Sequence, residues 1–326
     1  MRAVVTGGAG FIGSHLIEAL VQRRDDVLCI ERRGATPGWV STQPIEFAAT
    51  GIESVDRLER AFDGADVVFH LAALTEARTP EAFYAVNTEG THRVLQAAAR
   101  HGERAPRIVL LSSLAALGPC RNGEALSPDS VPCPLSHYGQ SKLLAEAMVH
   151  AYRDRVPATV LRFPSVYGPR ERGVLVFFRM VRRGFAVSIG RWDRELSMLY
   201  VDDAVDALLR AAASPVAAGR TYCVAHPETV SWARFADAAG RALGRMPVRL
   251  SVPVPAARAV AVGAELIAAL GRRAAILNRE RVRELTQARW VCDPSRALAE
   301  LGFRPRFAVE LGAERSVAWY RKEGWL

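Results

Sequence analysis

The stretch VVTGGAGFIG, residues 4–13, decides the fold of this chain. It ends an apolar run typical of a short strand and opens a run with helical periodicity, FIGSHLIEALVQR (11–23). Its glycines match the spacing G-x-G-x-x-G, which lets the backbone turn tightly, approach a pyrophosphate and present a helix N-terminus to the phosphates. The residues of this turn that we predict to line a dinucleotide are Gly7, Gly8, Gly10, Phe11, Ile12 and Gly13.

The end of the next apolar run, DVLCIE (26–31), bears on which dinucleotide binds. It places Glu31 about 20 residues after the glycines, as the fingerprint requires. A carboxylate there would accept hydrogen bonds from the adenosine ribose and repel a 2′-phosphate, which favours NAD. Arg32 and Arg33 follow directly and could hold a 2′-phosphate instead. We therefore expect NAD and leave NADP open.

Strand and helix signals alternate through the first 165 residues. Nearly continuous apolar runs are separated by helical runs such as NTEGTHRVLQAAARHG (87–102), which predicts parallel strands with crossover helices on both faces. After Gly168 the regular alternation of strand and helix signals ends, and from Ser231 the chain is predicted to be mostly helical. We predict an α/β fold, a doubly wound parallel sheet of Rossmann type with a smaller, mostly helical C-terminal substrate lobe. The predicted division is a dinucleotide-binding domain at 1–170, to which 198–214 returns, and a substrate lobe at 171–197 and 215–326.

Bulk composition narrows the class of protein. The formal net charge of +9 comes from scattered arginines with no basic block, so no nucleic-acid partner is predicted. The five cysteines show neither CxxC nor metal-ligand spacing, which indicates reduced thiols and no metal site. The first strand starts directly after Met1, and no apolar run reaches the roughly 20 residues that span a bilayer. We expect a cytoplasmic protein.

The segment SHYGQSKLLAEAM (136–148) predicts the chemistry. Tyr138 and Lys142 lie four residues apart and share one helix face, and Ser136 is a plausible N-cap. Lys142, the positive helix end and a bound nicotinamide cation would favour the phenolate of Tyr138, which could then exchange a proton with a substrate hydroxyl or carbonyl. Ser113 ends the run RIVLLSS (107–113), at the carboxyl edge of the sheet, and could hydrogen-bond the same oxygen.

The glycine turn, the Tyr138–Lys142 segment and further motifs along the chain are similar, in sequence and in order, to those of the extended short-chain dehydrogenase/reductase family. This family includes the NAD-dependent epimerase/dehydratases and the 3β-hydroxysteroid dehydrogenases. The resemblance covers nearly the whole chain, and the tail is most similar to that of steroid-dehydrogenase-like members. The motifs that carry it are TGGAGFIG (6–13), DVVFHLAA (66–73), VNTEGT (86–91), LLSSLAALG (110–118), YGQSK (138–142), LRFPSVYGP (161–169) and YVDDAVDA (200–207).

The resemblance implies a role for each motif residue. Tyr138 would be the acid/base, Lys142 would bind the nicotinamide ribose and lower the tyrosine pKa, and Ser113, rather than Ser112, would polarise the reacting C–O group. It also implies a homodimer, built from two helices of the first lobe of each copy. The further residues that it places at the cofactor are Leu71, Ala72, Ala73, Tyr138, Lys142, Pro164 and Val166.

Departures from the family pattern bear on the ligands. Gly51 stands where an aspartate often holds the adenine amino group. Leu196 stands where sugar-nucleotide members usually place an arginine that clamps the pyrophosphate, and an apolar side chain cannot neutralise a diphosphate. Arg194 or Arg191 could substitute after a small loop shift.

The segment VPVPAARAVAVGAELIAALG (252–271) is nearly free of charged residues. A core helix is the simpler interpretation of this segment, and a hydrophobic lid or a membrane-contacting patch is the alternative.

Three functions follow from these observations. The first is an NAD(P)-dependent dehydrogenase/reductase acting on a hydrophobic secondary alcohol or ketone, such as a 3β-hydroxysterol or related lipid; decarboxylation could follow if a carboxylate lay β to the new ketone. The second is a sugar-nucleotide 4-epimerase or dehydratase, with dehydration disfavoured because Leu114-Ala115 replaces the usual Asp-Glu pair. The third is a non-catalytic cofactor-binding protein, against which the intact Ser113, Tyr138 and Lys142 set argues.

Overall fold

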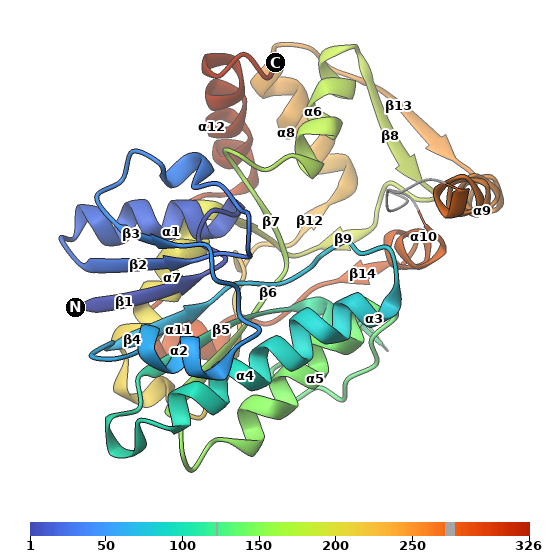
Figure 1. Cartoon of the computed structure of the whole chain (residues 1–326). Helices are drawn as coiled ribbons and strands as arrows, with labels where there is room; N and C mark the ends of the chain where they lie inside the picture. Colours follow the sequence, from blue (N-terminus) through green and yellow to red (C-terminus); the bar gives the residue numbers. More distant parts are fainter. Residues whose placement is uncertain (122, 271–277) are drawn as a thin grey trace.

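A parallel sheet forms the centre of the molecule (Figure 1), in a computed structural model that describes residues 1–121, 123–270 and 278–326. The seven strands run in the order β11-β6-β5-β4-β1-β2-β3, and every neighbouring pair is parallel. The α/β, Rossmann-type prediction is confirmed. The strands are β1 (Arg2–Thr6), β2 (Asp26–Ile30), β3 (Glu46–Ala48), β4 (Val67–His70), β5 (Arg107–Ser113), β6 (Ala158–Phe163) and β11 (Thr221–Cys223).

The strand order reverses beside β1, and this fixes where a ligand can bind. The chain passes from β1 outward to β2 and β3, then crosses back to β4 on the other side of β1. Thr6 at the end of β1 pairs with Ile30 on one side and His70 on the other, so three strand ends meet at one edge. Open α/β sheets bind ligands at such a reversal, beyond the carboxyl ends of the strands.

Helices cover both faces of the sheet, because nearly every strand residue is apolar and must be buried on both sides. Separate apolar clusters fill the two interfaces, one under α1 and α7 and the other under α4 and α5. The helices on the first face are α1 (Phe11–Gln22), α7 (Val201–Ala213) and α11 (Ser295–Glu300). Those on the second are α2 (Val55–Ala61), α4 (Glu89–Ala99), preceded by the short α3 (Pro80–Phe83), and α5 (His137–Ala151).

The remaining elements form a second apolar core, rich in aromatic rings, around three helices: α6 (Gly173–Arg182), α8 (Trp232–Leu243) and α12 (Val309–Lys322). Small sheets separate from the central one complete the described residues. Their strands are β7 (Ser165–Tyr167) with β10 (Met198–Tyr200), β8 (Phe185–Ile189) with β13 (Val248–Val252), and β9 (Glu195–Leu196) between β12 (Val230–Ser231) and β14 (Arg289–Trp290). The division of the chain into two lobes stays a prediction.

Helix α9 (Val254–Leu270) lies at the outer edge of this region, packed on the short helix α10 (Arg279–Leu285) (Figure 1). Ala257 and Ala261 are buried against Val282, whereas Val260, Val262, Leu266 and Ile267 are exposed. The interpretation of 252–271 as a core helix is therefore wrong for the part described; Gly271 lies outside the described residues. No helix among the described residues is both long and apolar enough to cross a bilayer.

Candidate active site

The glycine turn after β1 leaves no room for side chains where a pyrophosphate would approach. Gly7 has φ +76°, and a Cβ there would lie 2.7 Å from the backbone nitrogen of Ala72. A Cβ on Gly13 would lie 2.3 Å from the carbonyl oxygen of Gly7, so α1 can begin this close to β1 only with glycine. The turn therefore fits the phosphate cradle predicted from the glycine spacing.

Glu31 folds back onto this turn. The backbone N–H of Ala9 donates to its Oε1 at 2.8 Å, so the carboxylate lies beside the glycines at the end of β2. Arg32 is exposed to solvent. Gly51, at φ +74°, donates its backbone N–H to the carbonyl oxygen of Glu31 at 2.7 Å, so the position where the family often has aspartate contributes backbone to this site. These contacts suit a ribose-binding carboxylate.

The other residues assigned to the cofactor surround the same edge of the sheet. Leu71 and Ala72 donate their backbone N–H groups to Thr6, which holds the segment after β4 against the end of β1. Ala73 and Pro164 are partly buried. The remaining assigned residues, Phe11, Ile12 and Val166, are also partly buried and border the apolar cores.

Helix α5 starts tightly against the end of β5, and this brings Tyr138 to Ser113. The Ser136 hydroxyl caps α5 by accepting the backbone N–H of Gly139 at 3.1 Å, which confirms the predicted N-cap. A Cβ on Gly139 would lie 2.3 Å from the carbonyl oxygen of Ala115, just beyond Ser113. Only glycine lets the first turn of α5 sit this close. The Ser113 hydroxyl then lies close enough to the Tyr138 phenol to lower its pKa.

In the protein alone, the surroundings of Tyr138 favour its protonated form. Burial raises the pKa of Tyr138 above its usual value, and the Ser113 hydroxyl offsets only part of this effect. The expected lowering by Lys142 is not among the causes that act on it in the protein alone. The physical reason is that the free-energy cost of removing a phenolate from water exceeds the stabilisation that nearby groups give to it. Tyr138 is thus a protonated phenol at neutral pH.

Lys142 reaches the sheet beneath the site. Its Nζ donates to the carbonyl oxygen of Leu111 at 2.6 Å, and the side chain is almost fully buried. Burial lowers the pKa of Lys142 to about 8, with the carboxylate of Glu146 holding it from falling further. The ammonium form therefore still predominates at neutral pH, where it can donate hydrogen bonds to a ribose.

A buried ion pair that was not predicted from the sequence lies behind Lys142. Glu146, one turn further along α5, accepts from Arg162 of β6 at 2.7 Å and from the hydroxyl of Ser112. Ser112 therefore faces this pair, whereas Ser113 faces Tyr138. The signal was available, because Glu146 stands four residues after Lys142 and so shares its helix face.

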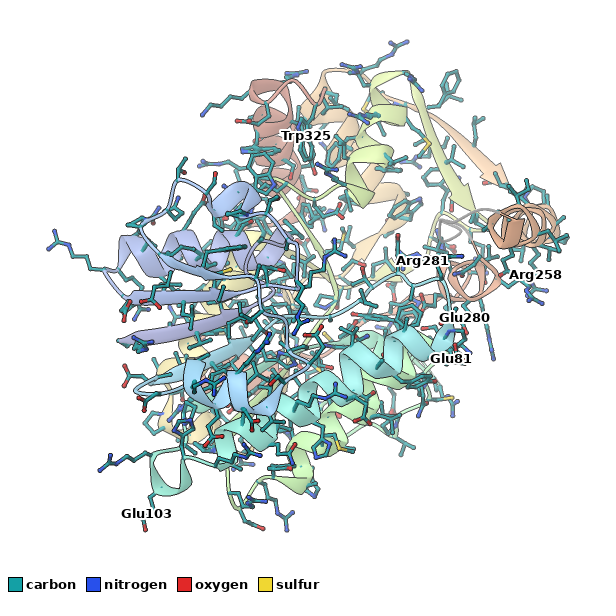
Figure 2. The ribbon with its side chains drawn as sticks, in the orientation of Figure 1. Glu81, Glu103, Arg258, Glu280, Arg281 and Trp325 are labelled. Carbon is teal, nitrogen blue, oxygen red and sulfur yellow. The ribbon has the colours of Figure 1, made fainter. Side chains whose placement is uncertain are left out.

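Helix α10 contributes charged groups that no motif predicted. The carboxylate of Glu284 accepts from the Ser136 hydroxyl at 2.6 Å, and that of Glu280 accepts from the backbone N–H of His137 at 3.2 Å. Both acids thus sit at the positive N-terminus of α5. Glu284 raises the pKa of Tyr138 and Arg281 lowers it, so both charges lie near the phenol. Figure 2 shows Glu280 and Arg281 where α10 approaches the start of α5.

The residues expected to bear on a sugar nucleotide lie in and beside β9. Leu196 pairs with Val230 of β12. The Arg194 guanidinium is buried, donates to Ser188 Oγ and the carbonyl oxygen of Arg191, and lies 5.9 Å from the centre of the Trp232 ring. Arg191 itself is exposed and ion-paired with Asp193. Both candidate substitutes for a pyrophosphate clamp are therefore already engaged within the second core or at its surface.

The family of the chain follows from its sequence as well as its geometry. The family model described as the NAD dependent epimerase/dehydratase family matches residues 3–225. Together with a glycine turn, a ribose-side carboxylate and a Ser-Tyr-Lys set on one sheet edge, this defines an NAD-dependent enzyme of the extended short-chain dehydrogenase/reductase type. The chain belongs to the NAD dependent epimerase/dehydratase family.

Similar proteins include some that are named for lipid substrates and some that are named for UDP-sugars. A ceramide reductase of Caulobacter vibrioides is 28% identical over 99% of this chain and 95% of its own. A 3beta-hydroxysteroid-dehydrogenase/decarboxylase of Arabidopsis thaliana is 25% identical over 96% of this chain and 78% of its own. The UDP-glucose 4-epimerase of Thermus thermophilus, solved with NAD, superposes with a TM-score of 0.79 at 24% identity, covering 98% and 99% of the two chains, which shows the shared fold.

Proposed function

We propose that the protein is an NAD-dependent dehydrogenase/reductase that interconverts a secondary alcohol and a ketone on a lipid. The observation that carries this proposal is the environment of β9. Leu196 occupies the position of the pyrophosphate-binding arginine, and Arg194 and Arg191 are held by other partners. A diphosphate would then meet no cation at that position, which disfavours a sugar nucleotide.

Two of the relatives support a lipid as the substrate class. A ceramide reductase and a hydroxysteroid dehydrogenase/decarboxylase both act, by their names, on apolar molecules, and the first matches almost the full length of this chain. We take a ceramide-like lipid with a secondary hydroxyl or the corresponding ketone as the first candidate and a 3β-hydroxysterol as the second. Loss of a β-carboxylate would be a consequence of the substrate and needs no further group of the protein.

The described residues can donate and accept the proton that this reaction transfers. NAD, when bound, supplies the hydride acceptor for oxidation and, in its reduced form, the donor for reduction. In reduction, Tyr138 gives its phenolic proton to the oxygen of the former carbonyl as the C–H bond forms, while Ser113 donates a hydrogen bond to the same oxygen. In oxidation the phenolic oxygen takes the hydroxyl proton. The raised pKa of Tyr138 keeps it protonated at neutral pH, which suits reduction.

The experiment is to follow reduced-nicotinamide absorbance with ceramide-type ketones and 3-ketosterols dispersed in detergent, and to assay UDP-sugars separately for C4 inversion. We expect oxidation of NADH with a lipid ketone, lost in Tyr138→Phe. Tyr152→Phe is the matched control, because Tyr152 ends the same helix and bonds His92, far along α5 from Ser113. C4 inversion of a UDP-sugar without net absorbance change would instead establish the epimerase alternative.

A further inference from the structure

The outer face of α9 is apolar where a water-facing helix normally carries charge. Val260, Val262, Leu266 and Ile267 are 60%, 41%, 65% and 72% exposed. The buried side of the helix is lined instead by small residues such as Ala257 and Ala261. Exposed aliphatic side chains grouped on one helix face mark an interaction surface rather than a solvated one.

The strand that leads into α9 also carries exposed aliphatic side chains. Val248 and Leu250 of β13 alternate along the strand, so they share a face, and they are also exposed. Arg249 lies between them on the opposite face and pairs with Asp237 at 2.6 Å. We name the exposed side chains of α9 and β13 the outer apolar face; its members are Val248, Leu250, Val260, Val262, Leu266 and Ile267.

The charged residues of α9 favour an anionic partner for this face. Between residues 254 and 268 the charged side chains are Arg258 and Glu265. Glu265 accepts from Arg279 of α10 at 2.7 Å on the inner side, whereas Arg258 is exposed and projects at the outer edge of α9 (Figure 2). A two-fold contact with a second copy would bring two such cationic faces together with no carboxylate of α9 left to neutralise them. An anionic bilayer supplies that negative charge.

The position of the face relative to the active site fits a lipid substrate. Helix α9 packs on α10, and α10 contacts the start of α5 through Glu280 and Glu284, directly beside Tyr138. One helix therefore separates the outer apolar face from the catalytic tyrosine.

We infer that α9 and β13 dock the protein on an anionic phospholipid bilayer, so that a lipid substrate passes from the membrane to Tyr138 by way of α10. This inference deepens the proposed function and rests on it for the nature of the substrate. Val260, Val262, Leu266 and Ile267 would enter the interfacial region of the bilayer, and Arg258 would lie among the headgroup phosphates.

The test is co-sedimentation of the full chain with vesicles of phosphatidylcholine alone and of phosphatidylcholine mixed with phosphatidylglycerol. We expect the protein to pellet with the mixed vesicles, and the ratio of bound to free protein to fall roughly ten-fold or more in the double variant Leu266→Glu/Ile267→Glu. Arg258→Glu should remove the preference for phosphatidylglycerol. Val216→Glu is the control, because Val216 is similarly exposed but lies in the turn after α7.

Three results would overturn the inference: protein that stays in the supernatant with both vesicles, a double variant that binds like the unaltered chain, or a dimer in gel filtration that the double variant dissociates. Turnover of detergent-dispersed lipid ketone is measured in parallel on the same variants. Turnover without vesicle binding would refute the membrane inference alone, whereas vesicle binding without turnover would refute the proposed function.

Discussion

Lys142 is a buried cation, and its cost to stability can be measured by replacing it with methionine, which has a similar length and no charge. The pKa of Lys142 is about 8 in the folded protein against 10.5 for a free side chain. At 1.36 kcal/mol per pKa unit, the ammonium costs the folded state about 3 kcal/mol at neutral pH. Loss of the hydrogen bond to Leu111 in Lys142→Met changes stability by a pH-independent amount, so the pH dependence isolates the charge.

The direction in which the free energy of unfolding changes with pH follows from proton binding to Lys142. Between pH 8 and 10.5 the unfolded chain binds the lysine proton more strongly than the folded protein, so the free energy of unfolding rises with pH in this window. Lys142→Met removes this rise. The stability of the variant relative to the unaltered chain should therefore fall by about 2.5 kcal/mol between pH 7 and pH 10. Titrations of other groups are common to both proteins and cancel in this comparison.

Urea unfolding followed by fluorescence of the six tryptophans measures the effect at each pH. The chain provides a matched control, because its other lysine, Lys322, is exposed on α12. Lys322→Met therefore serves as the control for replacing an exposed lysine by methionine. If the difference between Lys142→Met and the unaltered chain is the same at pH 7 and pH 10, the lysine is not desolvated as its contacts indicate, and its assignment as a buried ribose-binding cation is refuted.

Three further predictions concern the cofactor turn and the buried ion pair. Gly7→Ala should abolish stabilisation by NAD in thermal unfolding, because its Cβ would meet the backbone of Ala72; retained stabilisation would contradict the cradle. Glu31→Ser should raise the ratio of kcat/KM for NADP over NAD by about ten-fold or more, since the variant no longer repels a 2′-phosphate; an unchanged ratio would remove Glu31 from the ribose site. Glu146→Ala should lower the free energy of unfolding by about 3–5 kcal/mol, because it leaves the Arg162 charge buried and unpaired, and a loss below about 1 kcal/mol in urea unfolding would mean that water reaches Arg162.

The parts of the fold and site that rest on local sequence could be predicted. The glycine turn, the Ser136 cap and the Tyr138–Lys142 spacing are each fixed by backbone geometry within a few residues, and β1 and α1 lie where periodicity indicated. The choice of Ser113 over Ser112 also agrees with their partners, because successive strand residues face opposite sides.

The parts that depend on distant contacts could not be predicted. The carboxylates of Glu280 and Glu284 come to the start of α5 from more than 140 positions further along the chain, and no local pattern announces them. The pKa of Tyr138 depends on how deeply packing buries it. Helix α9 was misassigned to the core because a helix that is apolar on every side carries no signal for which side is buried.

The most direct test of the proposed reductase activity uses NADH carrying deuterium at C4 on the face that transfers hydride, incubated with the protein and a detergent-dispersed ceramide-type ketone. Mass spectrometry of the lipid then reports where the label goes. We predict one deuterium on the new carbinol carbon of the product, absent with Tyr138→Phe. A lipid that remains unreduced and unlabelled, together with C4 inversion of a UDP-sugar by the same preparation, would contradict the assignment to lipid reduction.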